Sequence, residues 1–103
     1  MRVLSVPPAA QRDENAIQMV SAWIAGEGLH CTLNIGMWQA AGREEPGAWG
    51  ILLADMVRHI GNAIQESEGS AANETQARIV QALLAELDEP TSRATGTFSP
   101  GHS

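Results

Sequence analysis

Residues 29–37 read LHCTLNIGM, a run in which apolar and polar side chains alternate. The apolar positions are Leu29, Cys31, Leu33, Ile35 and Met37. The polar or small positions are His30, Thr32, Asn34 and Gly36. A period of two residues is typical of a β-strand with one face against a core. The stretch therefore predicts a strand, and the segments around it predict how that strand is covered.

On the C-terminal side, residues 46–66 predict a long amphipathic helix, PGAWGILLADMVRHIGNAIQE. Pro46 suits the first turn of a helix, where its missing N–H would have no partner. Plotted at about 100° per residue, the large apolar side chains fall within a sector of roughly 120°. They are Trp49, Leu52, Leu53, Met56, Ile60 and Ile64. The residues between strand and helix, 38–45 (WQAAGREE), keep no period and are expected to form a loop.

On the N-terminal side, a helix is expected from Asp13, which can cap its first turn. Its apolar residues recur at helical spacing and include Ile17, Val20 and Ile24. The glycines at 26 and 28 are expected to end it, because glycine tolerates the left-handed backbone of a helix terminus. Before this helix, residues 2–6 (RVLSV) predict either an edge strand or an extended arm.

A third helix is expected over about residues 73–88. Asn73 and Gln76 match a capping box at its start, and Pro90 ends it. The following TSRATGTFSPGHS is rich in Ser, Thr, Gly and Pro and lacks a period, which predicts a disordered tail.

Together these segments predict an α+β fold, with three helices packed on one face of a small antiparallel sheet. Residues 1–90 are expected to form a single compact domain and residues 91–103 a disordered C-terminal tail. The strands would be 29–37 and, if it pairs, 2–6. Because a sheet of one or two strands is marginal and its edges invite pairing, we expect a homodimer.

The charge of the chain narrows the classes of partner. Twelve acidic residues against six Arg or Lys give a formal net charge of −6. The six basic residues are all arginines scattered along the sequence, so neither nucleic acid nor an anionic membrane surface is an expected ligand. The single cysteine permits no intrachain disulfide and no multi-cysteine metal site. The N-terminal residues lack a signal-peptide pattern, and no apolar run reaches about 20 residues, so a cytoplasmic location is expected.

The most suggestive polar set lies on the helix over 46–66. Four side chains fall within about 60° of one another on its polar side, namely Asp55, His59, Asn62 and Glu66. Asp55 could orient His59 for proton transfer or metal binding. The alternative is an ordinary solvated helix face, in which Asp55 pairs with Arg58 or His59.

The strand offers a second polar set. His30 and Cys31 are adjacent, but successive strand residues point to opposite faces, so the two cannot converge on one ion. Cys31 is expected to be a small buried hydrophobe. His30, Thr32 and Asn34 remain together as a hydrogen-bonding patch for a partner or ligand, unless that face is simply open to solvent.

Two other features indicate where another part of the chain or a partner could make contact. Small residues line one side of the helix over 46–66 at Gly50, Ala54, Val57 and Gly61, which indicates close approach of another backbone from the same chain or from a second copy. Trp38 lies beside charged residues just after the strand. It would either cap the core or anchor a partner.

The stretches WIAGEGLHCTLNIGMW and PGAWGILLADMVRHIGNAI, in this order, resemble a family of short bacterial proteins catalogued only as a domain of unknown function. The resemblance covers about residues 3–87. It implies a small, compact bacterial protein and implies no activity, substrate or cofactor.

Two functions remain open. The first is a non-enzymatic interaction or regulatory module that acts as a homodimer and binds a protein or a small molecule. Its binding surface would be His30, Thr32, Asn34, Trp38, Arg58 and Asn62. The second is a small metal- or acid–base-dependent enzyme that uses His59 with Asp55, joined by His30. The sequence contains no complete catalytic set and no recognised cofactor or metal motif, so we expect no cofactor and no metal.

Overall fold

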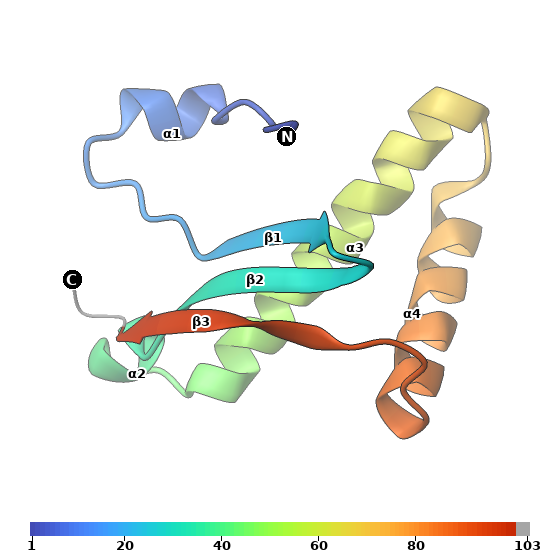
Figure 1. The fold of residues 1–103 in the computed structure, drawn as a ribbon. Helices are drawn as coiled ribbons and strands as arrows, with labels where there is room; N and C mark the ends of the chain where they lie inside the picture. Colours follow the sequence, from blue (N-terminus) through green and yellow to red (C-terminus); the bar gives the residue numbers. More distant parts are fainter. Residues whose placement is uncertain (101–103) are drawn as a thin grey trace.

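The computed structural model describes residues 1–100, and side-chain surroundings as far as Phe98. Figure 1 shows the sheet in front of a long helix, with a second helix at one side. The elements in chain order are α1 (Pro8–Arg12), β1 (Val20–Ala25), β2 (Gly28–Ile35), α2 (Met37–Ala40), α3 (Glu45–Glu68), α4 (Ala72–Asp88) and β3 (Ala94–Pro100).

The sheet has the order β1-β2-β3 and is mixed. β1 and β2 form an antiparallel hairpin, with Trp23 opposite His30. The two residues of its loop, Gly26 and Glu27, both have positive φ, as a type I′ turn requires. β3 runs parallel to β2 and reaches it after the chain has passed through α2, α3 and α4. A parallel neighbour needs such a long crossover.

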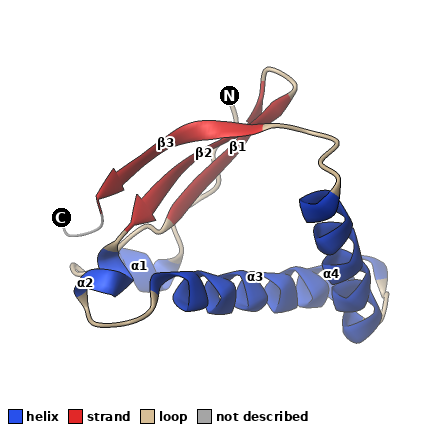
Figure 2. Cartoon of the chain, turned by 90° about the horizontal axis from the view of Figure 1, so that it is seen from below, coloured by secondary structure: helices blue, strands red, loops and turns tan. Residues whose placement is uncertain are grey.

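The α+β class is confirmed, and Figure 2 shows the helices on one side of the sheet. The expectation of an antiparallel sheet is wrong for β3. Part of the segment expected to be disordered, residues 94–100, forms this strand, and residues 101–103 of that segment lie outside the described residues. Gly96 makes the pairing possible. A Cβ atom there would collide with the carbonyl oxygen of Cys31, so the strand fits only with glycine at this position.

The helix expected from Asp13 is wrong, because residues 20–25 (VSAWIA) form β1. This short run fits both periods. Val20 and Ile24 are four residues apart, as in a helix, yet they also alternate with Ser21 and Trp23, as in a strand. The tight turn at Gly26 and Glu27 favours the strand over the helix, because it places residues 20–25 alongside β2.

Residues 2–6 form no strand. The edge strand is therefore not observed, since these residues have no regular secondary structure, and α1 follows them with Pro8 in its first turn. The capping box is also wrong. α4 begins at Ala72 with Ala71 as its N-cap residue, and no side chain caps it.

α3 and α4 form an antiparallel helical hairpin joined by a short connection. The carboxylate of Glu44 accepts a hydrogen bond from the Gly47 N–H (3.1 Å) and caps the start of α3. Gly69, with a φ of 80°, ends it. Gly61 is the point of close approach, since a Cβ there would lie 2.9 Å from Cγ of Gln76 and 3.1 Å from the carbonyl oxygen of Ala72. The expected close contact is therefore intrachain at Gly61, and its partner is α4.

Gly61→Ala and Gly50→Ala form a matched pair. The first should destabilise the protein by about 1 kcal/mol, because overpacking costs about 1–3 kcal/mol and helix propensity returns about 1 kcal/mol. The second should stabilise it by up to about 1 kcal/mol, because no atom lies within 4 Å of a Cβ built at Gly50. Urea unfolding of both variants checks this. A loss of stability in Gly50→Ala would place another backbone against that position.

The sheet and the helical hairpin bury little against each other. Extensive contacts join β1 to β2, β2 to β3, α2 to α3 and α3 to α4, but no strand packs extensively on α3 or α4. Within the described residues, only one apolar side chain is buried, Ala48 at 7% exposure. Ile24 of β1 is 82% exposed and Phe98 of β3 is 71% exposed. Elements that should supply a core are thus left uncovered in the single chain.

Within residues 1–100, no helix is both long enough and apolar enough to cross a lipid bilayer.

Candidate functional site

Glu45 ties the end of β2 to the start of α3. One carboxylate oxygen accepts hydrogen bonds from the Gly36 N–H (3.0 Å) and from Nε1 of Trp49 (2.9 Å), and the other accepts one from the Gln39 N–H (2.9 Å). Gly36 has a φ of 96°, so glycine is required at the bend between β2 and α2. This half-buried carboxylate therefore holds the short helix α2 against α3.

The same contacts lower the pKa of Glu45. The largest cause is the hydrogen bond from the Gly36 N–H, with further lowering by the bonds from Gln39 and Trp49, while desolvation opposes the shift. A pKa that is lower in the folded state stabilises the fold above the pKa of the unfolded state. This contribution is lost as pH falls through the folded value.

Glu45→Gln should therefore lower the melting temperature by several degrees at pH 7, because the amide cannot replace both charged acceptor oxygens. The difference from the wild type should shrink as pH falls from the ordinary pKa of a glutamate through the lower pKa of the folded Glu45 carboxylate. Thermal unfolding between pH 7 and pH 3 measures this, with Glu74→Gln on exposed α4 as a control. A gap of constant size at every pH would contradict the role of the charge.

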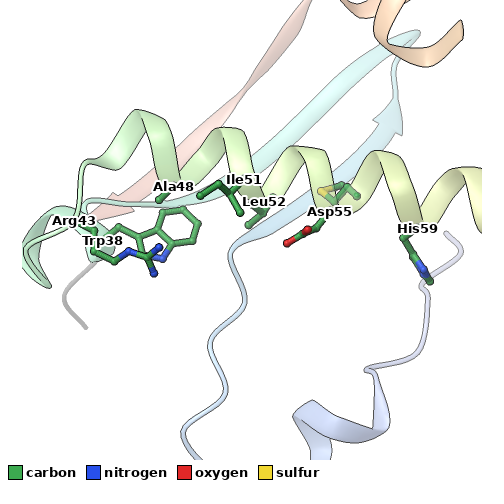
Figure 3. Close-up of a pocket in the computed structure, with 8 residues that line it drawn as sticks. Trp38, Arg43, Ala48, Ile51, Leu52, Asp55 and His59 are labelled. Atoms are coloured by element: carbon green, nitrogen blue, oxygen red, sulfur yellow. The ribbon is translucent and has the colours of Figure 1, made fainter. Parts of the chain in front are cut away.

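Trp38, held in place by this arrangement, forms one wall of a groove along α3. Its ring lies edge-on to that of Trp49, with centroids 5.4 Å apart and an interplanar angle of 88°. The groove has a volume of about 400 Å³. We call it the α3 groove, and it is lined by Trp38, Arg43, Ala48, Ile51, Leu52, Asp55, Met56 and His59. Figure 3 shows Asp55 and His59 projecting from the same side of α3.

The charged groups of the α3 groove are separate in the single chain. The carboxylate of Asp55 pairs with the guanidinium of Arg58, three residues further along the same exposed helix face. In the part of the chain that the structure describes, no hydrogen bond joins Asp55 to His59. The expected Asp55–Arg58 pair is therefore present.

The other residues that were predicted for the site do not line the α3 groove. Asn62 is exposed on α3, one turn beyond the groove. His30 lies on β2, where its Nδ1 is 2.9 Å from Oγ1 of Thr95 on β3. His30 does not line the α3 groove, so the groove holds His59 and Asp55 but not the third residue of the proposed catalytic set.

Thr32 and Asn34 of β2 line a second cavity, of about 430 Å³, with Ser21 of β1. Within the described residues, the Asn34 Oδ1 atom is buried and has no hydrogen-bond partner. Burying a hydrogen-bond acceptor without a partner reduces the stability of the fold, so a hydrogen-bond donor is expected at this position.

Arg43 and Glu45 were not predicted as site residues, because both lie in the segment that was expected to form a loop. Arg43 lines the groove, and Glu45 positions Trp38. The available signal was a carboxylate one residue before Pro46, at the expected start of a helix. Within the described residues, no group of three or more His, Cys, Asp or Glu side chains could hold a metal ion.

Residues 3–91 match the model of the family described as "Domain of unknown function (DUF5076)". The chain belongs to this family.

Among solved structures, the chain is similar to one over 92% of each chain, with 29% sequence identity and a TM-score of 0.66, and further solved chains also match. That protein is described as "a putative pyruvate dehydrogenase from the photosynthetic bacterium Rhodopseudomonas palustrus CGA009". None of the curated proteins matches the chain.

Proposed function

We propose that the protein is a non-enzymatic interaction or regulatory module that acts as a homodimer in the cytoplasm. The observation that carries the proposal is the amount of surface that one chain leaves exposed, 8409 Å². A compact monomer of this mass exposes about 5,600 Å². The excess is roughly 2,800 Å² per chain, or about 5,600 Å² for two chains, which reaches the upper end of the range for obligate dimers of about 2,000 to over 5,000 Å² in total.

The shape of the chain supports the same proposal. Its radius of gyration is 15.4 Å, whereas a compact chain of this length has one of about 13 Å. The exposed apolar side chains are also continuous along α4, where Val80, Leu83, Leu84 and Leu87 share one stripe. Folding of one chain alone would leave this stripe in water, and a second copy would cover it.

Light scattering at about 100 μM protein tests the homodimer. We expect twice the mass of the 10.9 kDa chain. A melting temperature that rises with protein concentration is expected as well, because dissociation and unfolding are coupled in obligate dimers. A monomeric mass would overturn the proposal.

A second candidate is a small acid–base enzyme that uses His59 and Asp55. The observation that favours it is their place in one groove, with Arg43 as a cation for a carboxylate substrate. His59→Gln and Asp55→Asn should each abolish activity on a screened set of small carboxylic acids, pyruvate included. Absence of turnover by the wild type removes this candidate.

The name of the Rhodopseudomonas protein suggests pyruvate oxidation, which requires a carbanion-stabilising cofactor such as thiamine diphosphate. A diphosphate bound through a divalent cation needs several oxygen ligands. The α3 groove contributes a single carboxylate, that of Asp55, and this carboxylate already pairs with Arg58. These residues do not fit such a group, and no step of that chemistry is assigned to them.

A further inference from the structure

The α3 groove has an apolar floor that one chain leaves partly in water. The floor consists of Ala48, Ile51, Leu52 and Met56, and we call this set the apolar floor. Ile51 is 58% exposed and Met56 is 42% exposed, although both line the groove. A molecule with an apolar body would therefore gain free energy by covering these side chains.

The two charged side chains that line the groove differ in whether they are neutralised. Figure 3 shows Arg43 beside Trp38 at one end of the groove, with Asp55 further along α3. The Asp55 carboxylate already pairs with the Arg58 guanidinium. Arg43 makes no ion pair within the described residues, so the groove carries one uncompensated positive charge in a chain whose net charge is −6. The end at Trp38 therefore attracts a single negative charge.

The backbone fixes where this cation stands relative to the apolar floor. The Arg43 N–H donates to the carbonyl oxygen of Trp38 (2.9 Å). The residue before it, Gly42, has a φ of 82°, which glycine adopts without strain. Because Glu45 ties the same turn to the start of α3, the position of Arg43 along the groove is set before a ligand binds, and this reduces the entropy lost on binding.

From this charge and these contacts, and given the non-enzymatic module proposed above, we propose that the α3 groove binds an aliphatic monocarboxylate of about eight carbons, with its carboxylate on Arg43 and its chain over the apolar floor. A guanidinium donates two parallel hydrogen bonds to a carboxylate. A dianion such as a phosphate monoester fits less well, because one arginine neutralises only part of its charge.

The length of the chain follows from the length of the floor. Since a helix rises about 1.5 Å per residue, the stretch from Ala48 to Asp55 is about 10 Å long, close to the length of an extended eight-carbon chain. At Asp55 the apolar floor ends at the ion pair with Arg58. A longer chain would have to remove water from these charges, which offsets the gain from its extra carbons.

A series of straight-chain carboxylates tests the site by isothermal titration calorimetry. The Kd should fall about fourfold for each CH₂ from butanoate to octanoate, and by less than about twofold for each CH₂ beyond octanoate. Octanol, which has the chain without the charge, should bind at least about tenfold more weakly than octanoate. Equal binding of octanol, or a Kd that does not depend on chain length, would overturn the inference.

Two arginine variants test the role of the charge. Arg43→Gln should weaken octanoate binding by at least about tenfold. Arg2→Gln removes the same charge from the N-terminal arm, which does not line the groove, and should leave the Kd within about twofold of the wild type. Both side chains are exposed, so both variants are expected to fold, and circular dichroism checks this. Equal effects of the two variants would overturn the site, because binding would then depend on net charge alone.

Light scattering of the same samples separates this inference from the proposed homodimer. A dimeric protein that does not bind octanoate would overturn the inference and leave the homodimer standing. Binding of octanoate by a monomeric protein would support the site and overturn the homodimer. The NMR spectrum of octanoate should stay unchanged during incubation with the protein, and its conversion to a product would contradict a non-enzymatic function.

Discussion

Leu84→Glu is expected to dissociate the proposed homodimer. The separated chains would then either unfold or leave their apolar surface exposed to water. In the single chain, Leu84 is 59% exposed on α4, and a substitution at so exposed a site ordinarily changes stability by less than about 0.5 kcal/mol. If a second copy covers the stripe on α4, the new carboxylate is buried without a partner. The penalty then reaches about 3–5 kcal/mol, which corresponds to more than 100-fold in Kd.

The control for this variant is Ala85→Glu, which adds the same side chain at the next position of α4. Ala85 lies about 100° further around the helix, on the side that carries Arg78 and Glu86. We expect Ala85→Glu to keep the wild-type mass in light scattering and the wild-type circular dichroism spectrum. If Leu84→Glu keeps both as well, α4 faces solvent and the dimer cannot use this stripe.

Trp38→Ala is expected to have the largest effect on stability among substitutions at the groove. Truncation removes the edge-to-face contact with Trp49 and one wall of the groove that Ala48, the most buried apolar side chain of the described residues, also lines. For this half-buried ring, we expect a loss of about 2–3 kcal/mol in the free energy of unfolding. Trp38→Phe keeps an aromatic ring at the position and should lose about half as much or less.

Trp23→Ala provides the comparison. Trp23 lies on β1, and its Nε1 donates to Oγ of Ser21 in the same strand. We therefore expect its removal to cost about 1 kcal/mol or less. Urea unfolding measures all three variants, and dilution in light scattering measures their Kd. A Trp38→Ala variant with normal stability but a weakened dimer would make Trp38 a partner anchor and not part of the core.

Local pattern predicted the elements whose period was long or unambiguous. The alternation of residues 29–37 predicted β2, and the apolar stripe between Trp49 and Ile64 predicted α3. The helix over 73–88 was also predicted, with an error of one residue at its start. In each case the run is long enough for a single period to exclude the other.

The two strands β1 and β3 were mispredicted for a common reason. VSAWIA is six residues long, so the same apolar residues satisfy a helical and an alternating pattern. ATGTFSP has the composition of a disordered tail, and only the neighbouring strand gives it a partner for its backbone hydrogen bonds. Strand pairing between segments far apart in the chain is not encoded in either segment alone.

The candidate site likewise combines a part that the sequence predicts with a part that only the tertiary structure shows. The positions of Asp55 and His59 on one helix face follow from helical spacing, which the sequence contains. The groove around them does not, because Arg43 and Trp38 reach it only after Glu45 has folded α2 back onto α3 through hydrogen bonds to Gly36 and Gln39.

By itself, then, the sequence determined the α+β class, the two long helices, the central strand and the order of polar residues along α3, because periodicity is a local property. Tertiary structure decided that residues 20–25 are a strand, that β3 joins the sheet in parallel beside Cys31, and that Trp38 walls a groove. These outcomes depend on which backbone groups meet in space. Such encounters are set by turns, glycines and single hydrogen bonds, which leave no period in the sequence.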